Sequence, residues 1–390
     1  MRRAVLAYIT LFVAVAAYAP YLQQYYQSLG IPLATIGALA AFTSAVALVS
    51  APIWGAIHDR YPTSRLFLPL AGAIGALGAT GLATVGASPL LIPSAAAFAA
   101  GMSGMGPMMD VRVLDMAGSD RTRYARVRVW GSISFIVCTP IVGLAIGQNY
   151  RGLFYVAIPM ILVGGLATML LPGRAGGVRG ASLRRAPGRV LGHRPIALFL
   201  IGAFVGWTAV YSQYAFFSIY LRQIGASSDQ IGLAWSIQAS LEIPSMIFFP
   251  QLSRRFGTER LIVLGMAIMT SRLIINALFV SPTILIAGSV IQGAGYGLVL
   301  IGGIAFVSRQ APKGTAATAQ GILSAVSFSL ASIVGSGVGG QIAGLVSIRG
   351  LYAIAAGLGA LAVVLFAMAV LPATRRSEAG AVSSSPPSQP

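Results

Sequence analysis

The sequence predicts an all-α membrane protein in which twelve transmembrane helices form two parallel six-helix repeats. Of the 390 residues, 56% are hydrophobic and only 9% are charged, which leaves too few charges for the surface of a soluble domain. Apolar runs of about 20 residues recur from end to end, and each is long enough to cross a hydrocarbon core of roughly 30 Å. The second half of the chain also repeats the first.

The repeat appears when the sequence is compared with itself at a shift of 195 residues. The matched positions are Gly30 with Gly225, Ile36-Gly37 with Ile231-Gly232, and the charged run 55–66 with 250–261. A membrane half duplicated in parallel orientation is the architecture of one large class of secondary transporters.

Six spans are expected in the N-terminal half, 1–171, and six in the C-terminal half, 196–372. They are 4–27, 33–57, 66–86, 90–114, 124–147 and 152–171, then 196–220, 230–252, 260–280, 283–307, 315–343 and 350–371. The first has the basic start of a signal peptide, but the repeat pairs it with a spanning segment, so we expect it to be retained. A Gly- and Arg-rich cytoplasmic linker, 172–195, joins the halves, and the tail 373–390 has a composition typical of disorder.

The charges are distributed asymmetrically, with a net charge of +18. Twenty of the 26 Lys and Arg residues fall in alternate connections, which predicts that these connections and both termini are cytoplasmic in a cell-membrane protein. Only Arg151, Arg222 and Arg349 fall on the opposite side. The basic balance therefore indicates topology rather than a nucleic-acid partner.

No pattern is typical of a metal site, a disulfide or a nucleotide-hydrolysing loop. Cys138 is the only cysteine, and His58 and His193 lie in different connections without ligand spacing. Lys313 precedes Gly-Thr but lacks the earlier glycine of a phosphate-binding loop. We expect no cofactor, no catalytic residue and no enzymatic activity. The expected state is a monomer whose partners are the bilayer, a small solute and protons.

Four charges are expected within the membrane: Asp110, Arg128, Glu242 and Arg272. Each costs about 2.5–3.5 kcal/mol at the bilayer centre, so each needs a partner, a wet cavity or a function. Glu242 lies about 15 Å from the cytoplasmic end of its span at 1.5 Å per residue, near the midplane. We interpret Glu242 or Asp110 as a proton carrier, and Arg128 and Arg272 as substrate or counter-ion groups. The alternative is two structural ion pairs, with Asp110–Arg128 as a cytoplasmic latch.

An aromatic stripe on the first span predicts part of a solute site. Tyr18, Tyr21 and Tyr25 share one helical face, and the repeat relates them to Gln213, Phe216 and Tyr220 on the seventh span. Tyr18, Tyr21 and Gln213 would line a central cavity and stack on or hydrogen-bond to a planar or hydroxylated solute. An interfacial aromatic belt is the alternative for Tyr25. A competing stripe, Trp207, Tyr211 and Tyr214, ranks lower because its repeat partners, Phe12, Ala16 and Ala19, are apolar.

A short charged turn follows the second span. It contains Gly55, Asp59, Arg60 and Arg65, and its carboxylate can cap a helix start and pair with an arginine. Such contacts would favour one conformation over another, which predicts a gating loop. A solvated loop is the alternative.

Several motifs resemble the major facilitator superfamily. The Gly55…Asp59-Arg60…Arg65 turn is similar to its loop signature. The segment Tyr124-Ala-Arg-Val-Arg128-Val-Trp130-Gly131-Ser132 resembles the Tyr-Gly-x-x-Arg-x-Trp-Gly-Ser block of the phenylpropionate permease-like and nucleoside/proton symporter-like branch. The same pattern includes Tyr21-Leu-x-x-Tyr, Ser28-Leu-Gly30, Glu242, Arg272, Gln292 and Thr318-Ala-Gln320-Gly321. The resemblance implies two six-helix halves around a central site, with Gln292 and Gln320 among its solute-binding residues.

The chain resembles lactose permease more distantly. That resemblance implies sugar-binding roles for Asp110 and Arg128. The chain departs from that protein on the tenth span, because the permease's histidine would fall near Gly295 and its proton-carrying glutamate near Leu298. Glu242 is therefore the best remaining proton carrier, or the protein is uncoupled.

Together these features predict a permease that moves a small polar or aromatic solute by alternating access, with proton symport. Two alternatives stay open. A drug/proton antiporter would fit the apolar helices but makes less use of two buried arginines. A solute sensor that kept the fold and lost transport would bind its ligand without flux.

Overall fold

The computed structural model describes the whole chain except residues 62, 119, 172–185, 313 and 384–390. The described residues form helices joined by short turns, and no strand occurs among them. Most of the expected linker, 172–195, lies outside the described residues, as does Lys313.

The first half of the chain folds into seven α-helices and two 3₁₀ turns. They are α1 (Arg2–Tyr18), α2 (Leu22–Ser28), α3 (Leu33–Arg60), α4 (Phe67–Val85), α5 (Leu91–Ala117), α6 (Arg121–Ile146), η1 (Tyr150–Gly152), α7 (Leu153–Ala167) and η2 (Thr168–Leu170).

The second half contains the remaining elements. They are α8 (Ala186–Leu191), α9 (Arg194–Gln223), α10 (Ser228–Phe256), α11 (Thr258–Leu278), α12 (Pro282–Ala287), α13 (Ser289–Gln310), α14 (Ala316–Ser324), the π-helix η3 (Ala325–Leu330), α15 (Ala331–Leu345) and α16 (Ile348–Ser383).

Eleven helical segments of the described chain are long and apolar enough to cross a membrane. They coincide with eleven of the twelve expected spans. The remaining span, 90–114, is the fourth in chain order and corresponds to the 27-residue helix α5. It is long enough to span, but its glycines, serines and three charges (Asp110, Arg112 and Asp115) lower its hydropathy. The predicted all-helical, multi-pass fold is confirmed.

Three spans are interrupted. The first breaks between α1 and α2 at Pro20, which has no backbone N–H to continue the helix. The tenth breaks at Gly288, between α12 and α13. The eleventh contains η3, a π-helical turn of the kind often found at functional sites.

The last helix is longer than the composition predicts. α16 continues to Ser383, although the sequence predicts a disordered tail from Ala373. The segment 373–380 contains Ala, Arg and Glu, which are good helix formers, and they extend the last span. Residues 384–390 lie outside the described part of the chain.

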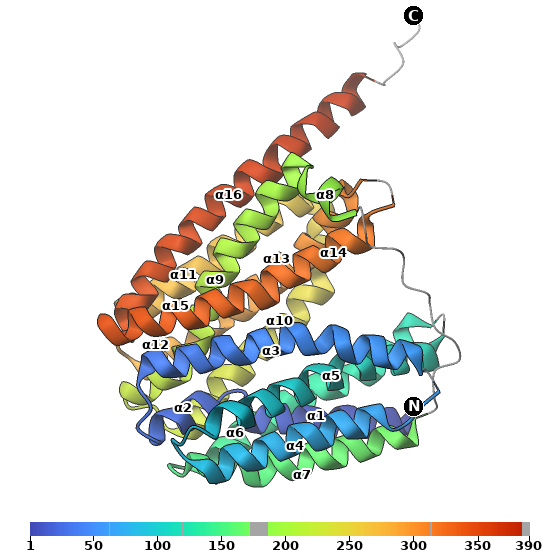
Figure 1. Cartoon of the computed structure of the whole chain (residues 1–390). Helices are drawn as coiled ribbons and strands as arrows, with labels where there is room; N and C mark the ends of the chain where they lie inside the picture. Colours follow the sequence, from blue (N-terminus) through green and yellow to red (C-terminus); the bar gives the residue numbers. More distant parts are fainter. Residues whose placement is uncertain (62, 119, 172–185, 313, 384–390) are drawn as a thin grey trace, which may run out of the picture.

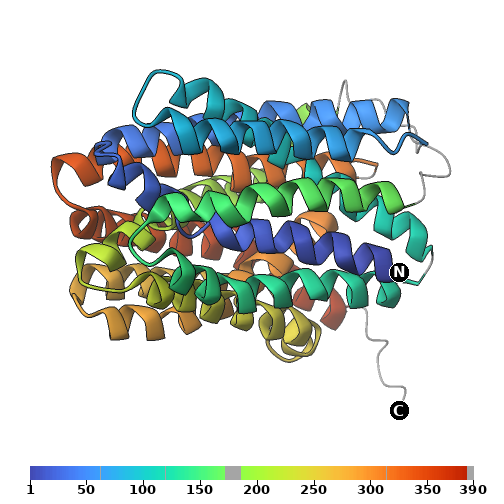
Figure 2. The same cartoon turned by 90° about the horizontal axis from the view of Figure 1, so that it is seen from below.

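The helices form two bundles, one from each half of the chain. Figures 1 and 2 show the N-terminal helices α1–α7 packed together and the C-terminal helices α9–α16 beside them. The bundles meet where α3 packs on α15 and α6 packs on α10. Two hydrophobic cores lie within this arrangement, the larger mostly in the N-terminal half and the second in the C-terminal half.

The repeat is visible in the backbone. Gly30 and Gly225, which the shift of 195 residues aligns, both adopt positive φ, at 78° and 97°. Each ends a helix just before the next span begins, and glycine tolerates this conformation because it has no Cβ. The next aligned pair, Gly37 and Gly232, both lie against the backbone of the opposite half.

The two halves are closed against each other at one end. Gln24 Nε2 donates to the Ser218 carbonyl (2.9 Å), and Ser236 Oγ donates to the Ile136 carbonyl (2.7 Å). Ser228 Oγ donates to the Gly147 carbonyl, again across the two halves. All three contacts lie toward the ends of the spans that are remote from the N-terminus.

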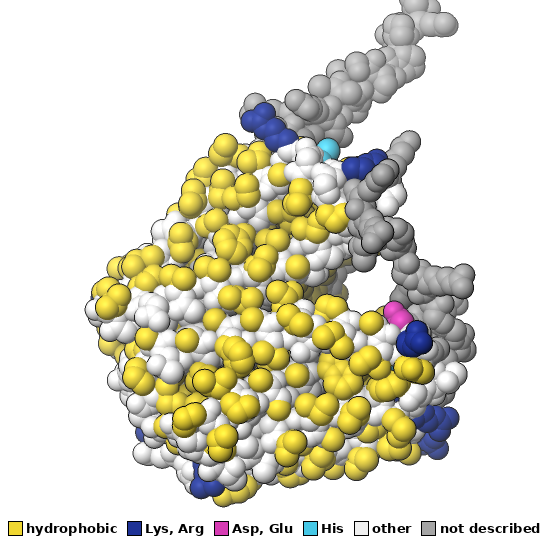
Figure 3. Space-filling view, viewed as in Figure 1, with side chains coloured by type: hydrophobic (Ala, Val, Ile, Leu, Met, Phe, Trp, Pro, Cys, Tyr) yellow, Lys and Arg dark blue, Asp and Glu magenta, His cyan; other side chains and the backbone are white. Residues whose placement is uncertain are grey.

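At the other end the halves are separated. Figure 3 shows a hollow between them, on the side where the N-terminus lies. The visible outer face is mostly apolar, as a surface in contact with lipid requires, and basic side chains lie beside the hollow. The molecule is therefore open to one side only.

Candidate functional site

A charged cluster in the N-terminal half joins α1, α5 and α6. Asp110 Oδ1 lies 3.7 Å from Arg128 Nε, and the Tyr8 hydroxyl donates to the same carboxylate oxygen. The side chains of Asp110 and Arg128 are 36% and 34% exposed, so the pair is accessible rather than sealed in the bundle. The two residues therefore meet, as their positions in the sequence predict, but Tyr8 was not predicted as a partner.

Aromatic rings hold the Arg128 guanidinium from a second side. Its Cζ atom lies 4.5 Å from the ring centroid of Phe12 and 5.5 Å from that of Tyr8. A Cβ atom on Gly131 would come within 2.8 Å of the Phe12 ring, so a larger residue at 131 would displace this ring. Asp110 and the two rings therefore fix the orientation of the Arg128 guanidinium. A planar guanidinium held in this way can donate two hydrogen bonds to an anion or to a pair of hydroxyl groups.

A polar network in the C-terminal half surrounds Glu242 on α10. Gln238 Nε2 donates to Glu242 Oε1 (3.1 Å) and to the Tyr214 hydroxyl (3.0 Å). Gln292 Nε2 on α13 donates to the same hydroxyl (3.2 Å), which joins α9, α10 and α13. Glu242 is partly buried, and its described hydrogen-bond partner is a neutral amide.

Aromatic rings extend this network along α9. Tyr214 lies 5.6 Å from Trp235 and 5.9 Å from Tyr211, and Tyr211 lies 6.1 Å from Trp207. This is the stripe that ranked lower in the sequence. Its last member, Tyr214, carries the hydroxyl on which the amides of Gln238 and Gln292 converge.

Arg272 lies deep in the C-terminal half, beside the aromatic rings that extend the Glu242 network, because Phe217 lies 6.5 Å from Trp235. Its side chain is fully buried, and no guanidinium nitrogen has a hydrogen-bond partner among the described residues. The guanidinium stacks on Phe217 at 4.8 Å and occupies the space at Gly288, where the tenth span breaks. Among the described residues no ion pair joins it to Glu242.

The predicted cavity-lining residues Tyr18, Tyr21 and Gln213 do not form one surface. Tyr18 is half-buried and packs edge-on against Phe98 at 4.9 Å. Tyr21 is fully buried and donates to the Thr139 carbonyl (2.7 Å) at the closed end. Gln213 is buried too, and its Oε1 has no partner among the described residues.

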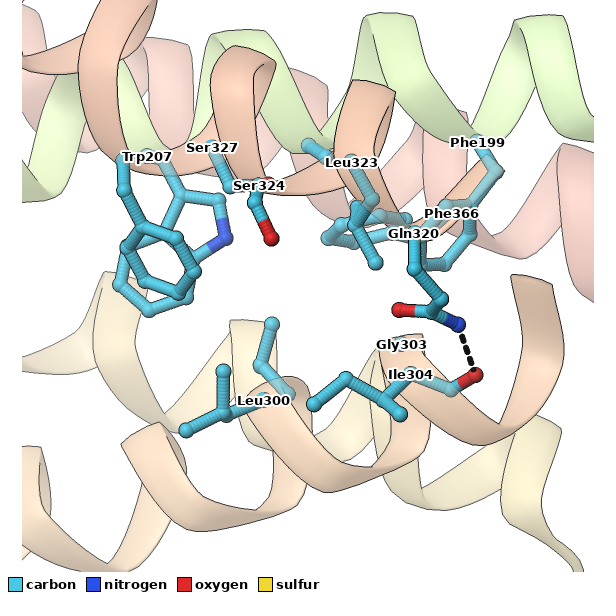
Figure 4. Close-up of a pocket in the computed structure, with 13 residues that line it drawn as sticks. Phe199, Trp207, Leu300, Gly303, Ile304, Gln320, Leu323, Ser324, Ser327 and Phe366 are labelled. Carbon is cyan, nitrogen blue, oxygen red and sulfur yellow. Dashed lines mark hydrogen bonds between the residues drawn. The ribbon is translucent and has the colours of Figure 1, made fainter. Parts of the chain in front are cut away.

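Gln320 borders a small cavity in the C-terminal half. Its Nε2 donates to the Ile304 carbonyl and to Ser308 Oγ, both at 2.8 Å. Figure 4 shows the side-chain oxygen of Gln320 turned toward the cavity. The volume is about 60 Å³, and Trp207 and Ser324 contribute to the lining.

The charged turn after α3 is tied to the bundle by an arginine that the sequence analysis missed. Arg112 of α5 is buried, donates to the Ser64 carbonyl, and has Nε 3.4 Å from His58 Nε2. Of the predicted loop residues, Arg60 lies 5.8 Å from the Tyr61 ring, and Gly55 has open space around it. The other two, Asp59 and Arg65, flank this anchored segment in the chain.

The C-terminal half has a similar anchor. Arg309 Nη2 on α13 lies 2.7 Å from Glu259 Oε1 at the start of α11. The shift of 195 residues aligns Glu259 with Ser64. In each half, therefore, an arginine from the fourth helix of the repeat holds the connection between its second and third helices.

No group of three or more metal-ligating side chains occurs among the described residues. The fold defines the class of protein: a multi-pass membrane transporter built from two six-helix repeats. The chain matches the family model described as MFS_1 like family over residues 2–354 and belongs to this family. The expected membership in the major facilitator superfamily is thereby confirmed.

Two relatives cover most of the chain. It is 28% identical over 342 residues to the maltose permease of Geobacillus stearothermophilus, covering 86% of each chain. It is 24% identical over 321 residues to the uncharacterized transporter YwbF of Bacillus subtilis (strain 168), covering 81% of this chain and 80% of that protein.

Solved structures share the fold. The nucleoside transporter NupG superimposes with a TM-score of 0.85 at 17% identity, covering 94% of this chain and 98% of that one. The POT family transporter PepTSo gives a TM-score of 0.75 at 12% identity, covering 94% and 97% of the two chains.

Proposed function

We propose that this protein carries a small hydroxylated ring solute across the cell membrane by alternating access, coupled to protons. The observation that supports it best is the Glu242 network: a membrane-embedded carboxylate hydrogen-bonded to an amide that also binds a tyrosine. Both termini would face the cytoplasm, as the positive-inside rule predicts, and the hollow would then open inward.

Glu242 is the proposed proton carrier. A charged carboxylate in the membrane costs free energy unless a cation compensates it, and Arg272 makes no ion pair with it among the described residues. Adding a proton removes the charge and turns an acceptor oxygen into a donor. The amide of Gln238 would then reorient, which passes the change to Tyr214.

The solute class follows from the side chains that the network and the N-terminal cluster present. Amides, tyrosine hydroxyls and aromatic faces suit a ring that carries hydroxyl groups. A maltose permease and a nucleoside transporter are among the proteins this chain is similar to, and both names denote solutes of that kind. We therefore propose a sugar or a nucleoside rather than an apolar drug.

Asp110 and Arg128 are proposed to contact the solute from the other half. Their partial exposure leaves the arginine fork accessible, and Asp110 can accept a hydroxyl proton. A solute bound at once to the N-terminal cluster and to the Glu242 network would draw the two halves together. It shifts the populations of the inward-open and outward-open states only if it binds these states unequally. Arg272, which is fully buried here, would act as a fixed counter-charge rather than a contact.

The experiment is proton flux in lightly buffered liposomes that contain the purified protein. External pH is recorded while maltose, glucose, uridine and adenosine are added in turn. Alkalinisation on addition of one solute class supports proton symport and identifies that class. Silence across the panel, with empty liposomes and a fully active reference permease as controls, would contradict the proposal.

A further inference from the structure

An apolar groove runs along α3 at the closed end of the molecule, bordered by the turn between α4 and α5 and by the start of α5. Buried side chains of Ile31, Leu39 and Leu91 (8%, 7% and 5% exposed) form part of its lining. The lining also includes Phe42 and Ile92, which are 38% and 53% exposed. In Figure 1 α3, α4 and α5 lie toward the viewer, and Figure 3 shows the same face to be mostly apolar.

The groove faces the lipid and is about as long as one leaflet is deep. Along α3 it extends from Pro32 to Phe42, which is about 15 Å at 1.5 Å per residue. Half of a hydrocarbon core of roughly 30 Å has the same length. Gly37, on the roughly opposite side of this helix, packs on α15, so the groove is directed away from the other half. An extended acyl chain of the leaflet at the closed end therefore fits along it.

A polar pocket adjoins the groove where these helices end. It lies between the end of α2, the end of α4 and the connection from α6 to α7. Gln148, Asn149 and Arg151 are exposed in its lining, and their side chains make no hydrogen bond or ion pair with the described residues. No acid occurs among the lining residues. The pocket therefore presents a cation and two amides without a compensating negative charge.

The pocket and the groove meet along two stretches of chain. Residues 28–29 border the pocket, and the next residues, 30–32, border the groove. Gly86 likewise borders the pocket, and 87–89 border the groove. A Cβ atom on Gly30 or on Gly86 would meet nothing within 4 Å, so the surface is open at both junctions. One molecule with a polar end and an apolar chain can therefore occupy both.

We propose that the pocket and the groove together bind one anionic phospholipid from the leaflet at the closed end. The phosphodiester accepts hydrogen bonds from the Arg151 guanidinium, and the amides of Gln148 and Asn149 bond to a hydroxylated headgroup such as glycerol. One acyl chain lies in the groove along α3. A zwitterionic lipid gains less from this pocket, because its own ammonium group already compensates the phosphate.

The test uses a phosphatidylglycerol analogue that carries a photoreactive diazirine midway along one acyl chain. The purified full-length protein is photolysed with it in detergent, and the modified peptides are identified by mass spectrometry. We expect modification within 30–42 or 87–92. Unlabelled dioleoyl phosphatidylglycerol should compete about fivefold better than dioleoyl phosphatidylcholine, the effect of one basic residue at a membrane surface.

Modification spread evenly over the apolar faces, or equal competition by the two lipids, would overturn the proposal. Inorganic phosphate should not compete, because it leaves the groove empty. Competition by phosphate as strong as that by phosphatidylglycerol would overturn a lipid as the occupant.

Matched variants separate the headgroup contact from the groove. Arg151→Gln should abolish the preference for phosphatidylglycerol, whereas Arg222→Gln, at the same end of the molecule, should keep it. Ala38→Phe fills the groove at an exposed position and should reduce its labelling, whereas Ala56→Phe, exposed on the same helix outside the groove, should not. Thr35→Phe, at a second exposed position of the groove, repeats this test if Ala38→Phe does not fold. A parental preference in Arg151→Gln, or parental labelling in the groove variant, would overturn the site.

Discussion

The backbone of Gly340 lies so close to Gly37 that a Cβ atom built on Gly37 would come within 2.6 Å of the Gly340 Cα atom. This contact joins α3 of one half to α15 of the other at the closed end. Its repeat counterpart, Gly232, would place a Cβ atom 2.7 Å from the Cα atom of Pro140 in α6. The closed end therefore depends on two symmetric contacts that only glycine permits.

Replacing Gly37 by leucine should hold the closed end open. No side chain fits between α3 and α15 without separating them, so the population shifts toward a state open on that side. Spin labels at Leu90 and Leu345, which are 62% and 84% exposed on opposite halves, report the separation. The distance between them should lengthen in the variant.

The control for this measurement is Gly357→Leu, because a Cβ atom at Gly357 meets nothing within 4 Å. It should leave the label distance unchanged. Gly232→Leu should act like Gly37→Leu, since the repeat relates the two. An unaltered distance in both α3 and α10 variants would contradict the proposed closure.

Arg128→Lys should weaken solute binding by about tenfold or more, because an ammonium cannot reproduce the planar fork or the stacking on Phe12. Binding is measured by calorimetry with the solute identified in liposomes. Arg126→Lys, at an exposed position on the same helix, should bind like the parent. Parental affinity in Arg128→Lys would exclude bidentate recognition.

Tyr8→Phe should destabilise the fold by about 1 kcal/mol, the net value of a hydrogen bond to a partly exposed carboxylate. Thermal unfolding in detergent measures the change. Tyr155→Phe, at a 72% exposed tyrosine of α7, should have no effect. Equal melting temperatures for Tyr8→Phe and the parent would show that the hydroxyl does not stabilise Asp110.

Arg272→Met should raise the melting temperature and increase the free energy of unfolding by about 2 kcal/mol. The reason is that it removes a buried guanidinium that has no hydrogen-bond partner among the described residues. Transport should fall in the same variant if Arg272 is the counter-charge proposed above. Arg222→Met, near the end of α9, should change neither. A lower melting temperature for Arg272→Met would mean that a hydrogen-bonding partner compensates the guanidinium.

Much of the fold could be predicted from the sequence, because apolar length and the duplication act through general constraints of the bilayer. The meeting of Asp110 and Arg128 could also be predicted, since a helical hairpin brings its two ends together. The roles of Tyr21 and Tyr214 could not. The break at Pro20 places Tyr21 in the contact between the halves, where its hydroxyl also lies 3.3 Å from the Ser228 carbonyl, whereas repeat symmetry alone assigns it to the cavity.

Tyr214 and Arg112 show a second limit. Tyr214 ranked low because its repeat partner is apolar, yet its hydroxyl is shared by Gln238 and Gln292 from two other helices. Such convergence depends on how three helices cross, which periodicity does not reveal. Arg112 lies near the end of the expected span 90–114, and its bond to the Ser64 carbonyl involves a backbone atom that no residue type marks.

The central claim is that Glu242 carries the coupling proton. The most direct measurement compares uphill accumulation with solute exchange for Glu242→Gln in liposomes, with Asp229→Asn, an acid in the first turn of the same helix, as the control. Glutamine preserves the shape of the side chain but cannot gain or lose a proton. The account predicts that accumulation driven by a proton gradient is lost while exchange persists, and that Asp229→Asn retains both. Accumulation at the parental level, or equal loss of both activities, would contradict it.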